Sequence, residues 1–170
     1  MTSTNYKAIA SKLKFEGRAF INGKYVDAID GEKFESINPA TGETLCSVAK
    51  CNYKDVDEAV KVSRKVFESG AWSKTSPEFR KDILLKFAEL LRKHGTENAV
   101  IECVDTGKLI NDCINEVAND TPMHFQWYAE LIDKIFGKVS PTDPSITSLI
   151  VKEPIGVVTG VVPWNFPLMM

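Results

Sequence analysis

The sequence has 170 residues, of which 44% are hydrophobic and 26% charged, and its net charge is −2. These values are typical of a globular protein with a sizeable core. The near-balanced charge argues against a nucleic-acid-binding protein and against binding to an anionic membrane surface. The four cysteines fit neither a disulfide framework nor zinc-ligand spacing, so we expect a cytoplasmic protein.

The N-terminal part contains turn signals between short β-type runs. Residues 1–18 are polar, and we expect them to form a frayed tail. Asn22-Gly23 lies between two β-type runs and predicts a hairpin. Asn38-Pro39 and Thr41-Gly42 predict turns between further strands. We therefore predict a small antiparallel sheet before the helices.

Apolar residues at helical spacing then predict four helices. Gly70 stands where the first should end, and Ser76 followed by a proline predicts the start of the second. Pro122 should kink or split the fourth helix, because proline lacks the backbone N–H that a helix interior requires. The expected helices cover residues 56–67, 77–94, 97–104 and 112–136.

The C-terminal part is predicted to be extended. A loop with two prolines precedes a β-branched strand at residues 147–151. Residues 155–162 are apolar on both faces, which is typical of a buried parallel strand covered by helices. A parallel strand needs parallel neighbours, and the sequence offers none after it, so we expect an incomplete fold. The apolar run 155–170 is too short to span a bilayer.

Six stretches, in the same order and at similar separations, resemble the N-terminal third of the NAD(P)-dependent aldehyde dehydrogenases. They are INGKYV, INPATGE, DVDEAV, DTGK, WYAELIDKIFGKV and EPIGVVTGVVPWNFPLMM, and the resemblance covers residues 19–170. Within that family, VFESGAWSKTSPEFRKDIL and DTGK…WYAELIDKI look most similar to enzymes acting on aminobutyraldehyde-type or γ-glutamylaminobutyraldehyde-type substrates.

The resemblance implies an α/β fold that forms the N-terminal part of a Rossmann-like cofactor-binding domain. It implies a polar tail at 1–18, part of the cofactor-binding domain at 19–136, an oligomerisation strand at 137–153, and the first, truncated core strand at 154–170. It also implies a homodimer or homotetramer with a small aldehyde as substrate, and neither nucleic acid nor membrane as a partner.

The implied reaction is oxidation of an aldehyde to a carboxylic acid with NAD or NADP through a cysteine thiohemiacetal. The nucleophilic cysteine and the glutamate that activates water are expected beyond residue 170, because no cysteine here matches the family's nucleophile segment. We therefore expect an N-terminal fragment that is inactive alone. The alternative is a non-catalytic binding or assembly module that pairs through the strand at 147–151.

Asn165 is the candidate catalytic residue. Its carboxamide offers two N–H donors and carries no titratable charge, so it stabilises an oxyanion at any working pH. Trp164 and Phe166 flank it, and prolines stand outside them. The resemblance implies that Asn165 is the oxyanion-hole asparagine of the family. Spacing alone favours a turn asparagine between a strand and a helix.

The resemblance also assigns neighbouring residues to binding. It implies that the aldehyde tunnel is lined by Phe166 and Met170, and core packing is the alternative for both. It also implies that the residues directly before and at Asn165 contact the cofactor, partly through their backbone. For Val161, core packing is the alternative. The implied cofactor-binding residues are Val161, Val162, Pro163, Trp164 and Asn165.

A monovalent cation site is implied as well. The Asp105 carboxylate and the backbone carbonyl of Ile37 match residues that hold a structural sodium or potassium ion in many family members. On local grounds, Asp105 is equally well explained as a helix-terminal acid that pairs with Lys108.

Overall fold

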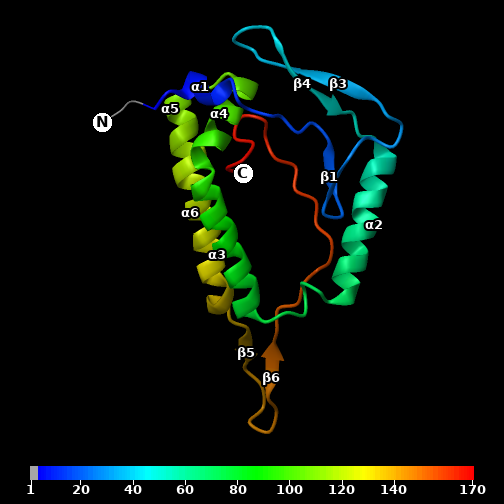
Figure 1. Cartoon of the computed structure of the whole chain (residues 1–170). Coiled ribbons are helices and arrows are strands. Elements are labelled where there is room, and N and C mark those ends of the chain that lie inside the picture. The colour runs from blue at the N-terminus through cyan, green and yellow to red at the C-terminus, as the bar shows by residue number, and fades with distance from the viewer. Residues whose placement is uncertain (1–3) are drawn as a thin grey trace.

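The computed structural model describes residues 4–170, and its elements form three two-stranded antiparallel sheets and a set of helices (Figure 1). The helices are α1 (Tyr6–Ala10), α2 (Tyr53–Ser69), α3 (Pro77–Lys93), α4 (Gly95–Thr106), α5 (Ile110–Cys113), the π-helix η1 (Ile114–Asp120), α6 (Thr121–Leu131) and the 3₁₀-helix η2 (Ile132–Lys134). The strands are β1 (Ala19–Ile21), β2 (Lys24–Val26), β3 (Lys33–Ile37), β4 (Thr44–Ala49), β5 (Lys138–Ser140) and β6 (Ser148–Ile150).

The hairpin predicted around Asn22-Gly23 is confirmed. Strands β1 and β2 pair antiparallel, with Ile21 opposite Lys24. Asn22 and Gly23 both have positive φ angles, 55° and 72°. Asparagine and glycine tolerate this backbone better than other residues, and the resulting two-residue turn matches the twist of the strands.

The predicted second pair of strands is also present. Strands β3 and β4 pair antiparallel, and the register shifts between Ser36 and Ile37. The connecting turn is closed by the Gly42 N–H, which donates to the Asn38 carbonyl at 2.8 Å. The antiparallel structure expected before the helices thus consists of two separate hairpins.

Helix α2 is fixed locally at both ends. The Asn52 side chain accepts from the Lys54 N–H at 2.8 Å, and the Asp55 carboxylate accepts from the Asn52 N–H at 2.8 Å. Asn52 therefore caps the helix, which begins at Tyr53, three residues before the predicted start. At the other end Gly70 has a φ of 77°, which confirms the predicted stop.

Helices α3 and α4 follow almost without a break. The Ser76 hydroxyl caps α3 by accepting from the Phe79 N–H at 3.1 Å, which confirms the predicted start. Helix α4 begins at Gly95, where an added Cβ would come within 2.8 Å of Ala118. Gly95 therefore allows α4 and η1 to approach closely. Gly107, with a φ of 76°, ends α4 near the predicted position.

The predicted fourth helix is split, as expected from Pro122. Its first part, α5 and η1, ends where the Thr121 N–H donates to the Glu116 carbonyl, five residues earlier. Pro122 has no N–H to continue the normal ladder, and the chain resumes as α6. The interruption is thus a π-helical segment directly before the proline.

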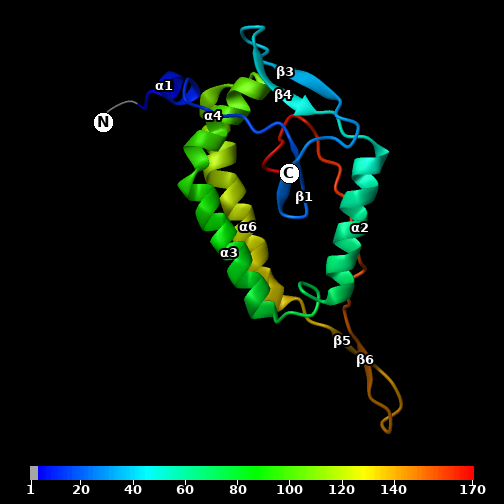
Figure 2. The same cartoon turned by 45° about the vertical axis from the view of Figure 1, so that its right-hand side comes forward.

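The core lies among α3, α4, α5, η1 and α6, which we call the helical layer. Ala99, Cys113 and Val117 form its buried centre. Helix α6 packs against α3, with Phe87 and Phe125 edge to face at 4.8 Å between ring centroids. The Lys81 ammonium lies 3.2 Å from the Asp133 carboxylate and joins α3 to η2. Figures 1 and 2 show these helices side by side, opposite α2.

The strand predicted at 147–151 is confirmed as β6, which pairs antiparallel with β5 in a hairpin. The buried strand predicted at 155–162 is not formed. These residues are irregular, and Ile155 and Val161 are 92% and 94% exposed. A strand needs a hydrogen-bonded neighbour, and none is present among residues 4–170.

The N-terminal segment contains a short helix that the sequence did not predict. Of residues 1–18, expected to be a frayed tail, 1–3 lie outside the described part of the chain, and Tyr6–Ala10 form α1, which packs against α4. The Asn5 side chain caps α1 by accepting from the Ala8 N–H at 3.1 Å. Within the part of the chain that the structure describes, no helix has both the length and the apolar character needed to cross a membrane.

Candidate functional site

The candidate site lies at the end of the C-terminal segment, which we define as residues 154–170. This segment runs between α2 and the helical layer and ends beside α4 (Figures 1 and 2). Its last part is a turn over Trp164–Met169, in which the Met170 N–H donates to the Phe166 carbonyl at 3.2 Å. We call Trp164–Met170 the asparagine turn.

The asparagine turn presents its polar group to solvent. Asn165 is exposed, and in residues 4–170 its carboxamide has no hydrogen-bond partner. Trp164 is 82% exposed, whereas Phe166 is half-buried. Pro163 and Pro167 restrict the backbone on both sides, because each fixes its own φ and narrows the conformations of the residue before it.

Lys108 joins the asparagine turn to the helical layer. Its ammonium donates to the backbone carbonyl of Asn165 at 3.2 Å. The same ammonium lies 4.4 Å from the centroid of the Phe166 ring, within the range of a cation–π interaction. Lys108 therefore contacts two consecutive residues of the turn.

Two glutamates hold the Lys108 ammonium on its other side. Glu102 of α4 lies 3.2 Å away, and Glu116 of η1 also pairs with it. Burial disfavours the charged ammonium, but hydrogen bonds to Glu116 and Glu102 outweigh that effect, so the pKa of Lys108 is raised. Lys108 therefore stays positively charged at neutral pH.

Glu102 is the most buried member of this cluster, with 6% of its surface exposed. One carboxylate oxygen binds Lys108, and the other has no hydrogen-bond partner among the described residues. A buried carboxylate without its counter-ion would be costly, so Glu102 and Lys108 depend on each other.

The predicted cofactor residues are contiguous and exposed. Val161, Val162, Pro163 and Trp164 lead directly into Asn165. The backbones of Val161 and Val162 make no hydrogen bond within residues 4–170, so they are free to contact a ligand. Among the described residues, Val161 packs against no core and is 94% exposed.

Phe166 and Met170, predicted to line a substrate tunnel, lie at the two ends of one turn. Phe166 is half-buried and packs on Lys108, while Met170 is exposed. The structure therefore gives Phe166 a packing partner and leaves Met170 open to solvent.

The predicted cation ligands lie on β3 and at the end of α4. The Asp105 carboxylate accepts from the Ser36 hydroxyl at 2.7 Å. Ser36 directly precedes Ile37, and both Ser36 and Asp105 line a hollow of about 440 Å³. The alternative pairing of Asp105 with Lys108 is wrong, because the carboxylates that bind Lys108 are those of Glu102 and Glu116.

The four cysteines are unpaired thiols. Cys113 is fully buried, and its burial raises the pKa of its thiol to about 11. Cys103 is half-buried and donates to the Lys108 carbonyl at 3.1 Å, and burial raises its pKa as well. Cys113 is thus a buried thiol and Cys103 a partly buried one, and a thiol with a raised pKa is a poor nucleophile at neutral pH.

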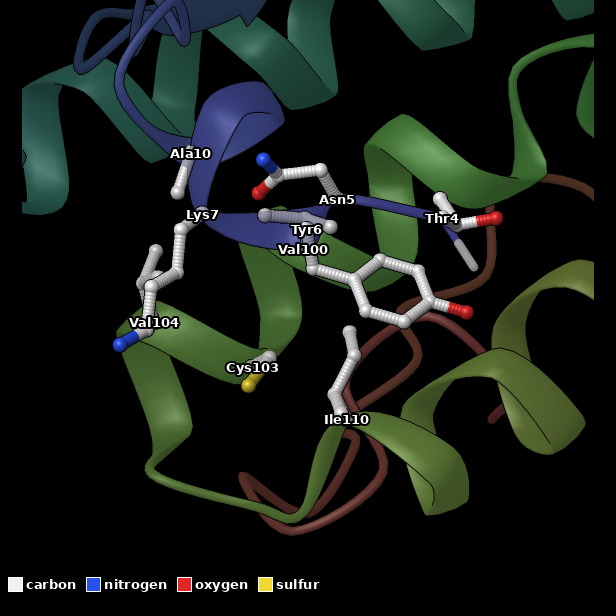
Figure 3. Close-up of a pocket in the computed structure, with 9 residues that line it drawn as sticks. All are labelled: Thr4, Asn5, Tyr6, Lys7, Ala10, Val100, Cys103, Val104 and Ile110. Carbon is white, nitrogen blue, oxygen red and sulfur yellow. The ribbon is translucent and has the colours of Figure 1, made fainter. Parts of the chain in front are cut away.

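A separate apolar hollow of about 640 Å³ lies between α1 and α4. Figure 3 shows Tyr6 of α1 facing the side of the hollow formed by Cys103 and Ile110. None of the residues predicted for cofactor, substrate or cation lines it. It marks the place where α1 rests on α4 and carries no chemistry for the candidate site.

Sequence reasoning did not find the Glu102–Lys108–Glu116 cluster. Lys108 follows Gly107, which ends α4, but nothing in the spacing indicates that its side chain reaches a turn 57 residues away. The only local signal is a lysine just after a glycine-capped helix that contains a glutamate six positions earlier.

Comparison with known proteins identifies the family. Residues 25–170 match the aldehyde dehydrogenase family. The chain is 46% identical over 170 residues to the aminoacetaldehyde dehydrogenase of Pseudomonas aeruginosa, a match that covers 100% of this chain and 34% of that relative. Because the family match covers most of the sequence, the chain belongs to the aldehyde dehydrogenase family, and the expected family and its α/β fold are confirmed.

Solved structures agree with this assignment. The indole-3-acetaldehyde dehydrogenase of Pseudomonas syringae, solved with NAD⁺, has a TM-score of 0.94 and 42% identity, covering 97% of this chain and 33% of that one. The γ-glutamyl-γ-aminobutyraldehyde dehydrogenase of Burkholderia cenocepacia has a TM-score of 0.94 and 40% identity, covering 96% and 33%. The chain spans about a third of the length of these relatives.

Proposed function

We propose that the polypeptide containing this chain oxidises an aldehyde to a carboxylic acid with NAD or NADP, through a cysteine thiohemiacetal. The observation that supports the proposal most directly is the asparagine turn, which lies within the family match and presents Asn165 on a stiffened backbone. The chain supplies part of the site, and the nucleophile belongs to another part of the polypeptide.

Asn165 is the proposed oxyanion donor. When a thiolate attacks the carbonyl carbon, negative charge develops on the aldehyde oxygen. The Asn165 carboxamide, exposed and without another hydrogen-bond partner in the described chain, can donate an N–H to that oxygen. Because the amide does not titrate near neutral pH, its contribution does not depend on protonation.

The proposed cofactor-binding residues are Val161, Val162, Pro163, Trp164 and Asn165. The unpaired backbone of Val161 and Val162 fits this role, since a dinucleotide can be held by backbone groups at the end of an extended segment. When bound, the nicotinamide supplies the hydride acceptor. The residues of this chain would hold the nicotinamide beside Asn165, and Trp164 would exclude water from it.

The proposed substrate is a small aldehyde, and an aminoaldehyde is favoured. Phe166 and Met170 would line its path, because an aromatic ring and a flexible thioether suit an alkyl chain. An amino group on the substrate is supported by the similar proteins, which include an aminoacetaldehyde dehydrogenase and a γ-glutamyl-γ-aminobutyraldehyde dehydrogenase.

A sodium or potassium ion is proposed near Asp105 and Ile37. The carboxylate of Asp105 and the hydroxyl of Ser36 are hard oxygen donors, which suit such cations, and they already lie 2.7 Å apart. The backbone carbonyl of Ile37, which follows Ser36 on β3, would be the third oxygen ligand.

A homodimer or homotetramer is proposed for the complete polypeptide. The β5–β6 hairpin projects from the rest of the chain (Figure 1). It carries exposed Val139, Leu149 and Ile150, and each of its two strands has a free edge. An exposed apolar edge favours pairing with a strand of another subunit. The same feature would support the non-catalytic assembly module.

The test is the Asn165→Ala variant of the full-length polypeptide. We expect kcat for aldehyde oxidation to fall about 10²–10³-fold, because one preorganised oxyanion donor is removed. Steady-state kinetics with aminoacetaldehyde and NAD⁺ or NADP⁺ would measure it. Asn111→Ala, an exposed asparagine on α5, is the matched control and should leave kcat unchanged.

Two outcomes would overturn the proposal. An Asn165→Ala enzyme with unchanged kcat would remove Asn165 from the chemistry. A full-length polypeptide that associates through the β5–β6 hairpin but shows no turnover with any aldehyde would instead support the assembly module.

A further inference from the structure

We infer that Lys108 is a positioning residue, which fixes the asparagine turn so that the Asn165 carboxamide is held in one place. The inference rests on the proposed role of Asn165 and extends it to a residue that does not touch the substrate. Lys108 acts on the backbone of Asn165 and on the ring of Phe166.

The geometry restrains the turn at two points. The ammonium donates to the Asn165 carbonyl at 3.2 Å and lies 4.4 Å from the Phe166 ring centroid. The carbonyl belongs to the peptide that joins these two residues, and the ring projects from the second. Rotation of that peptide would move the Asn165 side chain. Because Lys108 contacts both the carbonyl and the ring, it limits this rotation.

The ammonium is itself held by the helical layer. Glu102 is buried on α4, and Glu116 lies on η1, so two packed helices fix the position of the positive charge. The Lys108 backbone is fixed too, because its carbonyl accepts from the Cys103 thiol at 3.1 Å. A side chain anchored in this way loses little further freedom when it contacts the turn.

No other hydrogen bond within residues 4–170 joins the asparagine turn to the helices. The remaining hydrogen bond of the turn is internal, between the Met170 N–H and the Phe166 carbonyl. Removing the Lys108 ammonium would therefore break the one hydrogen bond that joins the turn to the helical layer within residues 4–170. It would also leave the buried Glu102 carboxylate without its counter-ion, an effect for which Lys108→Arg controls.

Such a role predicts a specific kinetic pattern. A displacement of about 1 Å at a catalytic group can cost about a hundredfold in rate. Lys108→Met keeps an unbranched side chain, one atom shorter, and removes its charge. We expect it to lower kcat about tenfold or more, because the loss lies in transition-state stabilisation.

A double-mutant cycle in the full-length polypeptide tests whether Lys108 acts through Asn165. In an Asn165→Ala background, Lys108→Met should lower kcat less than about twofold further, because the group it positions is already gone. Lys108→Arg retains the ion pairs and the cation–π contact, and should recover most of the activity. Lys81→Met, which breaks an ion pair elsewhere in the helices, is the control and should leave kcat unchanged.

Additive losses in the cycle, or an Arg variant as impaired as the Met variant, would show that Lys108 is not a positioning residue. Equal loss in Lys81→Met and Lys108→Met would show a general effect of helix stability. Each of these results contradicts the inference while leaving the proposed role of Asn165 intact.

A second measurement does not depend on dehydrogenase activity. In the 170-residue chain, NMR should show the ε-methylene protons of Lys108 shifted upfield by the Phe166 ring, and Phe166→Leu should abolish the shift. A shift in the 170-residue chain, together with a full-length polypeptide that oxidises no aldehyde, would support the Lys108 contact and overturn the proposed function. The absence of any shift would overturn the inference itself.

Discussion

The helical layer and the C-terminal segment are built from similar apolar residues, but these residues are buried in the first and exposed in the second. Val117 of the helical layer is 1% exposed, whereas Val161 of the C-terminal segment is 94% exposed. Helices satisfy their own backbone hydrogen bonds, so the helical layer needed only side-chain packing between neighbours. An extended segment needs a partner for its backbone as well. The comparison teaches that apolar sequence becomes a core only where backbone partners are also present.

The largest expected effect is in proteolysis. Chymotrypsin should cleave after Trp164 roughly a hundredfold faster than after Trp127, although both side chains are exposed, 82% and 61%. Trp127 lies in α6, whose backbone must unfold locally before it enters a protease, and Trp164 lies outside any helix or strand. Mass spectrometry of a digestion time course measures both rates. Equal rates would mean that the helical layer is no more ordered than the C-terminal segment.

A smaller effect is expected from shortening one valine in each region. Val117→Ala should lower the free energy of unfolding by about 2 kcal/mol, because buried methyl groups are lost and a cavity remains. Val161→Ala, the same change at an exposed position, should alter it by less than about 0.5 kcal/mol. Urea denaturation followed by circular dichroism gives both values. A comparable loss at Val161 would show that the C-terminal segment packs in solution.

The smallest effect concerns α2, which lies outside the helical layer and is held by local contacts. The Asp55 carboxylate accepts N–H bonds from Asn52 at 2.8 Å and from Ile29 at 2.9 Å, and these bonds lower the pKa of Asp55. The ionised form is therefore favoured in the folded state. The ionised Asp55 carboxylate therefore stabilises the fold at pH values above the ordinary aspartate pKa of about 3.9. This contribution is lost as the pH falls through the lower pKa that Asp55 has in the folded protein.

The Asp55→Asn variant should accordingly be less stable than the original at neutral pH, and the difference should shrink as pH falls below about 4. Urea midpoints measured across this range would show it. Asp57→Asn, an exposed aspartate on the same helix, is the matched control. A difference independent of pH would mean that the Asp55 charge contributes nothing to the cap.

The fold was predictable where single residues dictate local geometry. Asn22-Gly23 specified a hairpin turn, Gly70 and Ser76 specified helix ends, and Pro122 specified an interruption. Prediction failed at residues 155–162, where the apolar pattern indicated a strand but a strand also requires a neighbour. The short α1 was missed because it depends on packing against α4 more than on its own sequence.

The candidate site was predictable in its contiguous part. Val161 to Met170 are consecutive, so they necessarily lie on one segment, and the resemblance assigned roles to them. The resemblance also linked Ile37 with Asp105, and the structure brings Ser36, the neighbour of Ile37, against Asp105. Lys108 could not be assigned in this way, because its contact with Asn165 depends on where α4 ends and where a distant turn returns.

By itself the sequence determined the helices, the hairpin turns, the family and the presence of a lone amide between two aromatic rings, because each is encoded in neighbouring residues. Only the tertiary structure decided which of these groups meet. It set a lysine between two glutamates and a backbone carbonyl, and it left an apolar segment exposed to solvent. The reason is physical: hydrogen bonds within a helix or tight turn are local, whereas strand pairing and charge contacts join residues that are far apart in the chain.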